Sequence, residues 1–456
     1  MTPMSTTVTN YDGSISSTPQ QLVRPKSIEE LQNILKQRDK YPSPVRAMGS
    51  YHSLTPCVSS PGTIVDMKAL DKILRIDAEK MTLTAQAGLE MIEAADAMRK
   101  LKLQFILNIE IGNMTLGSAA CCHTKDALDG VGFGQVNSFV TGVKWVSPSG
   151  TLEEASEEKN PELLPLIRAS YGLAGIVYEV TFKIKPLEVI EFDYEVIDVA
   201  SVTQDHISEV IASNDCMVCW TVGHRLVIQT RNHAIKLKHH ILPEARRFGW
   251  SFLGAFAGRA IRQAALPTDV THALEDLGSG IELGFYQLLS ATGGFTLLDP
   301  NKMVNYSKTP KSGRYAFTFW AFPRQDWVKN LNDYVDFADK YFAKHGFRCN
   351  MPLGSYFIRQ DTSSLLSYTH DGDIISLDPI HAPGDRDKEA WNSFLREFNE
   401  WAHPRGGIPL LNQSPFITKQ HVVAAYGDRW KKLCDWVRTA DPDGRMVSPF
   451  FAELMV

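Results

Sequence analysis

The sequence predicts an α+β fold in which two successive parts each combine strands with covering helices. Short strand patterns and two amphipathic helices alternate along residues 18–101. A stretch of alternating apolar and polar residues at 175–185 then runs into Pro186. Beyond this proline, strand and helix patterns alternate again as far as residue 402. Such an order is typical of α+β proteins with mixed sheets, and Pro186 is the predicted boundary between the two parts.

The first part begins with a helix that follows Pro25 and Ser27, with Glu29 and Glu30 in its first turn. A second amphipathic helix is predicted at 89–101. The predicted strands of this part lie at 45–49, 63–66, 73–77, 81–87, 138–146 and 175–185.

The second part is predicted to form a cap, a second sheet covered by helices. Its strands are predicted at 189–199, 216–223, 225–232, 315–322, 354–359 and 373–378. Its helices are predicted at 202–213, 325–345 and 387–402, with a basic and apolar helical region as far as about residue 280. The predicted domain limits are 8–186 for the first domain, 187–405 for the cap, and 406–456 for a C-terminal segment that returns to the first domain.

Composition narrows the function classes. Of the 456 residues, 44% are hydrophobic and 22% are charged, and the net charge is −5, which is ordinary for a globular protein. A nucleic-acid-binding surface would need clustered basic residues, so none is expected. The chain starts without a cationic, apolar leader, and no stretch is long and apolar enough for a spanning helix. We therefore expect a cytoplasmic protein that has no membrane span and acts on a small molecule.

Seven cysteines in a chain of this length do not suggest a disulfide framework. Cys216 and Cys219 form a single CxxC on a predicted strand, where residues three apart face opposite sides. Neither a zinc site nor a redox dithiol is predicted there, and we expect no bound metal. Cys121 and Cys122 lie in a run of small residues, and we interpret them as buried structural thiols.

Three glycine-punctuated segments contain the candidate site. The first is GSYHS at 49–53, in which Gly49 lets backbone N–H groups approach a phosphate-bearing ligand beside His52. The second, NMTLGSAACC at 113–122, is a run of small residues that can lie against a flat or phosphorylated ligand. The third, GLAGIV at 172–177, is a turn that leads into an alternating strand. Taken singly, each segment could be a turn or close helix packing.

In this order and spacing the segments resemble the PCMH-type FAD-binding domain of the vanillyl-alcohol-oxidase family, in particular its aldonolactone and alditol oxidase branch. The resemblance implies that FAD is the cofactor and that His52 carries it covalently. Whether Cys121 or Cys122 forms a second flavin bond stays open. The residues that the resemblance places against FAD are Arg46, Gly49, Ser50, Tyr51, His52, Ser53, Asn113, Thr115, Gly117, Ser118, Cys121, Gly172, Gly175, Ile176 and Val177.

The same resemblance implies the substrate side. Lys419 matches a lysine of the family's C-terminal signature, and Arg359 matches an arginine of a cap strand. Both are predicted to be catalytic, because a cation near the flavin stabilises charge on the reduced ring or polarises the substrate oxygen. The alternative for each is an exposed surface charge. Phe357 and Phe416 replace a glutamate and a histidine of the family, and its oxygen-access position falls near Ile109 or Glu110.

The predicted function is FAD-dependent oxidation of a small organic substrate, with molecular oxygen as the expected electron acceptor. A dehydrogenase with another acceptor, a sugar-alcohol or aldonolactone oxidase, and a flavin-binding protein without turnover are the alternatives. Phe357 and Phe416 each replace a hydrogen-bonding group by an aromatic face. A substrate less polar than a sugar polyol is therefore predicted, as in secondary metabolism.

Overall fold

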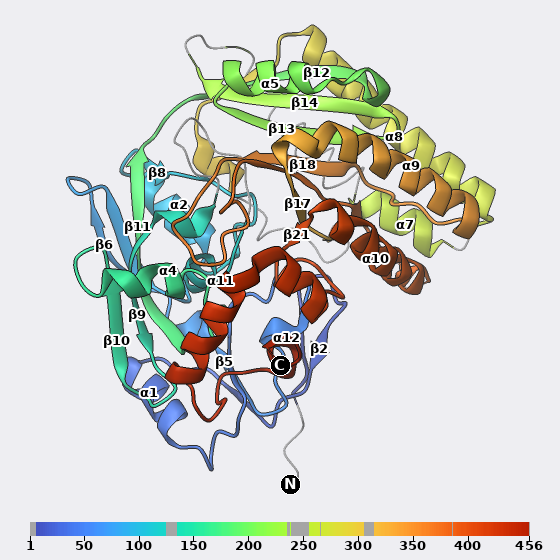
Figure 1. The fold of residues 1–456 in the computed structure, drawn as a ribbon. Coiled ribbons are helices and arrows are strands. Elements are labelled where there is room, and N and C mark those ends of the chain that lie inside the picture. The colour runs from blue at the N-terminus through green and yellow to red at the C-terminus, as the bar shows by residue number, and fades with distance from the viewer. Residues whose placement is uncertain are drawn as a thin grey trace.

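The structure is a computed structural model, and it describes residues 6–124, 135–234, 238, 255–264, 266–304, 314–384 and 386–455. Figure 1 shows two halves that each contain sheets and helices, with the long strand β11 (Ile176–Pro186) leading from the first to the second. The predicted α+β class is confirmed. β11 ends at Pro186, and the next strand, β12 (Ile190–Asp198), already belongs to the sheet of the second half.

A three-stranded parallel sheet presents the first loop of the site. Its strand order is β3-β5-β4, with β3 (Gln21–Val23), β4 (Val45–Met48) and β5 (Thr63–Asp66). Helix α1 (Ile28–Lys36) connects β3 to β4, and the Ser27 side chain caps it by accepting the Glu30 N–H. Loop 49–53 leaves β4 directly. The short strands β1 (Val8–Thr9) and β2 (Ser16–Ser17) pair with each other.

A second, antiparallel sheet forms the main wall of the first half, in the order β10-β9-β11-β7-β6, and β8 pairs with β11. Its strands besides β11 are β6 (Ile73–Asp77), β7 (Thr82–Gln86), β8 (Leu103–Phe105), β9 (Val140–Val146) and β10 (Leu152–Ser156). The helices of this half are α2 (Met91–Arg99), α3 (Leu116–Cys121) and α4 (Leu164–Ile167). The short helix α3 places the small-residue segment against β7 and β11.

The second half is built on an eight-stranded antiparallel sheet with the order β15-β12-β14-β13-β18-β19-β17-β21. Its further strands are β13 (Cys216–Val222), β14 (Arg225–His233), β15 (Phe295–Leu297), β17 (Trp320–Pro323), β18 (Leu353–Ile358), β19 (Ile374–Leu377) and β21 (Ile408–Pro409). The strands β16 (Ala316–Phe317) and β20 (Ile380–His381) form a separate pair. The helices are α5 (Gln204–Ser213), α7 (Gly258–Gln263), α8 (Thr268–Ala291), α9 (Trp327–His345) and α10 (Lys388–Ala402).

The two faces of this sheet are both buried, but in different surroundings. Along β13, Val218 and Trp220 pack with Tyr286 of α8 on one face. Met217 and Cys219 pack on the other face, in the core that holds the helices α5, α9 and α10. Successive strand residues alternate between these faces, so the register of each strand decides which side chains can reach the site.

The C-terminal segment touches both halves. β21 pairs with β17 of the cap sheet, after which α11 (Lys419–Ala440) and α12 (Pro449–Met455) lie against the first half (Figure 1). Between them, the fully buried Arg445 donates hydrogen bonds to the carbonyls of Ile34 and Leu35 at the end of α1. The segment is thereby fixed to the first half.

The structure contains elements that were not predicted, among them β8 and β10, and several predicted elements differ from it in their bounds. The predicted strand at 315–322 is divided between β16 and β17. Of the helical region expected to end near residue 280, residues 239–254 lie outside the described residues, and the described part continues as α8 to Ala291. The predicted strand at 138–146 begins inside a 3₁₀ turn, Val136–Phe139. Among the helices of the described residues, none has the length and apolar character needed to cross a membrane.

Candidate active site

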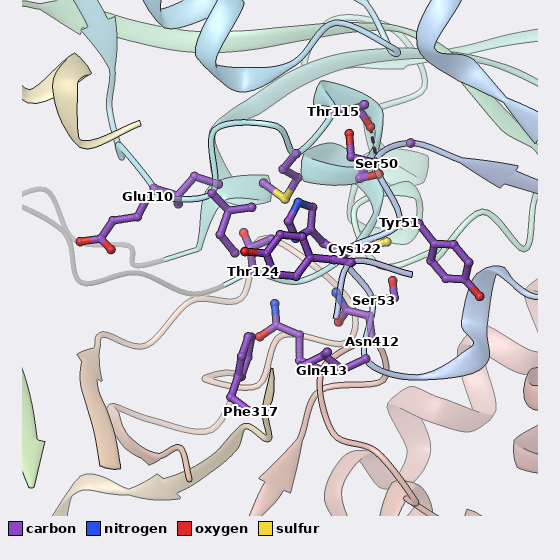
Figure 2. Close-up of a pocket in the computed structure, with 18 of the residues that line it drawn as sticks. Ser50, Tyr51, Ser53, Glu110, Thr115, Cys122, Thr124, Phe317, Asn412 and Gln413 are labelled. Atoms are coloured by element: carbon purple, nitrogen blue, oxygen red, sulfur yellow. Dashed lines mark hydrogen bonds between the residues drawn. The ribbon is translucent and has the colours of Figure 1, made fainter. Parts of the chain in front are cut away.

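One cavity lies between the two halves, and Figure 2 shows it from close by. The first half contributes loop 49–53, the segment 109–122 and the turn at 171–177. The cap contributes side chains from β12, β13, β14, β15, β16, β18 and α8. The C-terminal segment adds Asn412 and Gln413. Segments far apart in the sequence thus meet at one enclosed space.

Loop 49–53 approaches the start of α3 very closely. A Cβ atom on Gly49 would lie 2.2 Å from the Thr115 hydroxyl oxygen, so only glycine leaves room there. The next turn of the loop is held by Tyr51, whose φ is +52° and whose hydroxyl bonds Ser59 at 2.8 Å. Ser50 donates a hydrogen bond to Glu90 at 3.4 Å. Gly49 and Thr115 are thus in contact, and backbone and hydroxyl groups line this part of the cavity wall.

Replacing Gly49 by Ala should weaken FAD binding by about 10- to 100-fold, because overpacking of this kind typically costs about 1–3 kcal/mol. FAD affinity would be titrated with apoprotein that also carries His52→Ala, so that binding is reversible. The double variant Gly49→Ala/Thr115→Ala removes the clashing hydroxyl and should recover most of the affinity. An unchanged affinity in the single variant would show that the Thr115 side chain can move aside for the added methyl group.

His52 lies at the tip of the loop, on the cavity wall. Its Nε2 is 2.5 Å from the side-chain oxygen of Asn113, and the Tyr11 ring stacks on it with 4.3 Å between ring centres. Burial lowers the pKa of His52 to about 4, and the Arg314 guanidinium acts in the same direction, against the Asn113 hydrogen bond. The imidazole is therefore neutral near pH 7. With Nε2–H donated to Asn113, Nδ1 keeps its lone pair.

The other two segments supply flat, small surfaces. In α3, a Cβ on Gly117 would lie 2.8 Å from the Ala87 Cβ, and the hydroxyls of Thr115 and Ser118 are 3.0 Å apart. In the turn before β11, Gly172 and Gly175 have φ values of +70° and +136°. A Cβ on Gly175 would lie 2.3 Å from the Val146 carbonyl oxygen. Both glycines are required by backbone conformation.

Most residues predicted to contact the cofactor line the cavity, but two do not. Those on the wall are Arg46, Gly49, Ser50, Tyr51, His52, Ser53, Thr115, Gly117, Ser118, Cys121, Gly172, Gly175 and Val177. Asn113 does not line the cavity, but its side-chain oxygen lies 2.5 Å from Nε2 of His52, which does. Ile176 is fully buried in the core of the first half. Adjacent residues of a strand point to opposite faces, so Ile176 points into the core while Val177 points into the cavity.

The Arg46 guanidinium makes hydrogen bonds to the main chain of the protein. Four of its N–H groups donate to main-chain carbonyls, those of Cys57 at 3.0 Å, Tyr171 at 2.5 Å, Gly172 at 3.2 Å and Met446 at 2.7 Å. These carbonyls belong to three different segments, because Tyr171 and Gly172 are neighbours in the turn at 171–177. We therefore interpret Arg46 as the side chain that holds loop 49–53, the turn at 171–177 and the C-terminal segment together.

The residues predicted to act on the substrate lie mostly outside the cavity lining. Phe357 is 5% exposed and faces the helix-covered side of the cap sheet, and Arg359, just after β18, lies over its ring. Lys419 is exposed at the start of α11, and Phe416 lies under the Arg396 guanidinium. Glu110 does line the cavity, and in Figure 2 its carboxylate points away from the centre.

The cap wall instead consists of side chains that sequence reasoning mostly missed. The aromatic residues on it are Phe192, Trp220, Tyr286, Phe295, Tyr315, Phe317 and Tyr356. Leu297, Met303 and Ile380 extend this surface, and Arg231 and Lys302 are its cations. The available signal was the alternation of the cap strands, which puts Trp220 and Tyr356 on the same face of the sheet.

Part of the first half is similar in sequence to known FAD-binding domains. A family model described as FAD binding domain matches residues 19–156. The chain is similar to L-galactono-1,4-lactone dehydrogenase of Arabidopsis thaliana, 27% identical over 189 residues, which are 41% of this chain and 31% of that protein. It is similar to L-gulono-1,4-lactone dehydrogenase of Mycobacterium tuberculosis, 28% identical over 186 residues, which are 40% of this chain and 42% of that protein.

L-gulonolactone oxidase of Bos taurus is 23% identical over 177 residues, which are 39% of this chain and 40% of that protein. The chain thus spans less than half the length of these curated relatives.

Solved structures share the fold over the full length. A cholesterol oxidase from Brevibacterium sterolicum covers 99% of this chain and 97% of its own, with a TM-score of 0.75 and 15% identity. A solvent-stable cholesterol oxidase covers 99% of this chain and 98% of its own, with a TM-score of 0.69 and 17% identity. The two-part arrangement of a cofactor half and a cap is therefore a known fold.

Proposed function

We propose that this chain is an FAD-linked oxidoreductase with a PCMH-type FAD-binding domain, and that it oxidises a small organic substrate with FAD bound between its halves. The observation that carries the proposal is a single cavity that joins the glycine-rich loops of the first half to the aromatic wall of the cap. FAD supplies an acceptor for a hydride from a substrate C–H bond, while a substrate O–H or N–H group loses a proton.

The residues proposed to hold FAD are those that leave space and offer hydrogen bonds. Gly49, Thr115 and Ser118 lie together on the cavity wall, where backbone N–H groups and hydroxyls suit a diphosphate. The turn at 172–177 and Cys121 offer a flat surface for the ring system. Asn113, although off the wall, would act by orienting His52.

We further propose that His52 carries FAD covalently through Nδ1. The neutral imidazole offers a lone pair there, because Nε2–H is donated to Asn113. Tyr11 stacks on one side of the ring and restricts its rotation. Cys121 and Cys122 also line the cavity, and both thiols are free, so mass analysis of the flavin peptide would also reveal a second bond.

The substrate that the cap wall favours is less polar than a sugar polyol. Seven aromatic side chains face the cavity from the cap, so a polyhydroxylated molecule would meet mainly aromatic faces there, and each hydroxyl left without a partner would cost about 1–3 kcal/mol. The curated relatives are named for lactones and the structural neighbours for cholesterol. We favour an apolar or aromatic alcohol, and an aldonolactone is the alternative.

A panel of substrates would test this directly. The second-order rate constant of anaerobic flavin bleaching should be higher with alicyclic or aromatic alcohols than with xylitol, sorbitol or L-gulono-1,4-lactone, by on the order of 100-fold or more. Reoxidation in air with release of peroxide would identify oxygen as the acceptor, and slow reoxidation would favour a dehydrogenase. Efficient turnover of the polyols or the lactone would refute the apolar substrate, and no bleaching by any compound would refute the enzyme.

A further inference from the structure

We propose that Thr124, Asn412 and Gln413 form a subsite that binds the hydroxyl group of the substrate as a hydrogen-bond donor. This inference rests on the proposed oxidation and names the substrate class, an uncharged alcohol whose remaining skeleton is apolar. The three residues come from the loop after α3 and from the turn after β21, and all three line the cavity. In Figure 2 the Gln413 side chain extends between Phe317 and Thr124.

The three side chains share an unused acceptor. The Thr124 hydroxyl oxygen, the Asn412 amide oxygen and the Gln413 amide oxygen make no hydrogen bond in the described part of the chain. The residues are only 6%, 7% and 8% exposed. Buried polar atoms in native proteins are nearly always paired, and leaving one unpaired is costly. Three such atoms on one cavity wall therefore indicate that a polar group of the ligand lies beside them.

The orientation of the Asn412 amide is fixed by its neighbour. Its nitrogen donates to the main-chain carbonyl of His123 at 3.1 Å. A carbonyl can only accept, so the amide cannot turn over without losing this bond, and its oxygen must remain the free end. The ligand that meets this oxygen must therefore bring a hydrogen, as an alcohol does and as a ketone or ether does not.

The turn that carries the two amides is held rigidly at both ends. The carbonyl of Asn412 accepts from the Leu54 N–H at 2.8 Å, which ties the turn to the cofactor loop. The Ser414 hydroxyl donates to the Phe319 carbonyl at 2.5 Å, which ties it to the cap. Positions fixed in this way need little reorganisation when a ligand binds, so they suit a specific hydrogen bond.

The surroundings define the rest of the ligand. None of the three side chains carries a charge, so a carboxylate or phosphate would lack a counter-charge among them. Phe317, Tyr356 and Trp220 line the same cavity from the cap. A single hydroxyl on an apolar ring would meet both needs, because the hydroxyl donates its one hydrogen to the Asn412 oxygen and can accept from the Thr124 hydroxyl, while the ring packs on the aromatic faces.

The subsite would also distinguish substrate from product. Oxidation removes the hydride from carbon and the proton from the hydroxyl, which leaves a carbonyl. The carbonyl has no hydrogen to offer the Asn412 oxygen, so that acceptor becomes unpaired again when the reaction is complete. Binding of the ketone is therefore weaker than that of the alcohol, which favours product release.

Tertiary alcohols provide the test, because they carry the hydroxyl but have no hydrogen on its carbon and cannot be oxidised. With the intact holoenzyme, the Kd values of 1-methylcyclohexanol and 1-methylindan-1-ol would be compared by calorimetry with those of cyclohexanone and 1-indanone. Each alcohol should bind about 10-fold more tightly than its ketone. Asn412→Leu and Gln413→Met should reduce this preference to less than about 2-fold without changing ketone affinity.

The matched control is Gln360→Met, the same substitution at an exposed cap residue, which should leave the preference unchanged. FAD content and the flavin absorption spectrum are measured in every variant without ligand. Variants that lose FAD or shift its spectrum would show that the amides hold the flavin, which overturns the substrate assignment. Equal binding or no binding of alcohol and ketone by the wild type would also overturn it. A wild type that holds no FAD would instead refute the proposed function.

Discussion

Replacing His52 by Ala is expected to abolish covalent attachment of FAD completely. Wild-type protein precipitated with acid should stay yellow, and a peptide that contains His52 should carry the mass of the flavin. In the variant the flavin should be released on denaturation, although the native protein still binds it through the glycine-rich loops. Release of all flavin from denatured wild-type protein would contradict the covalent bond.

The pH dependence of attachment follows from the pKa of His52. Attachment needs the neutral imidazole, and burial lowers this pKa to about 4 from the ordinary value near 6.5. The protonated fraction therefore stays small until the pH falls toward 4. The rate at which apoprotein incorporates FAD covalently should be nearly flat from pH 8 to about pH 5 and should fall below that. A midpoint near 6.5 would mean that His52 is solvated.

Asn113→Leu provides a control for the tautomer. It removes the acceptor for Nε2–H but leaves His52 in place, so the lone pair is no longer confined to Nδ1. Covalent incorporation should become slower without being lost. If incorporation were as fast as in the wild type, the hydrogen bond to Asn113 would have no part in attachment.

The cofactor side of the site could be predicted from the sequence because its requirements are local. Gly49 and Gly175 are fixed by clashes with Thr115 and Val146 that any side chain would meet. Such constraints leave a glycine in a short motif, and the spacing of three motifs then identifies the domain. The match to an FAD-binding model over 19–156 supports that part of the interpretation.

The substrate side of the site could not be predicted in the same way, because the register of each cap strand decides which of its side chains face the cavity. Tyr356 and Phe357 are neighbours on β18, yet one faces the cavity and the other the helix-covered core. A resemblance that is off by one residue on a strand therefore selects the wrong face. Likewise, the turn after β21 brings Asn412 and Gln413 to the wall and leaves Lys419 exposed on α11.

The largest loss of stability is expected from Arg46→Met. The variant keeps the volume but leaves the carbonyls of Cys57, Tyr171, Gly172 and Met446 without their donor. At about 1–3 kcal/mol for each unpaired buried group, and with partial relaxation, the loss should be on the order of 3–5 kcal/mol. The thermal midpoint should fall by about 10 °C, measured at matched FAD content.

Arg38→Met separates this loss from the general effect of removing an arginine. Arg38 pairs with Asp443, and because the two side chains are 52% and 59% exposed, such a pair contributes about 0–1 kcal/mol. Its thermal midpoint should change by no more than about 3 °C. An Arg46→Met protein with an unchanged midpoint that fails only to retain FAD would show that the guanidinium binds the cofactor directly. A fall in the thermal midpoint of the apoprotein as well would show that Arg46 supports the cavity wall by holding the segments of that wall together.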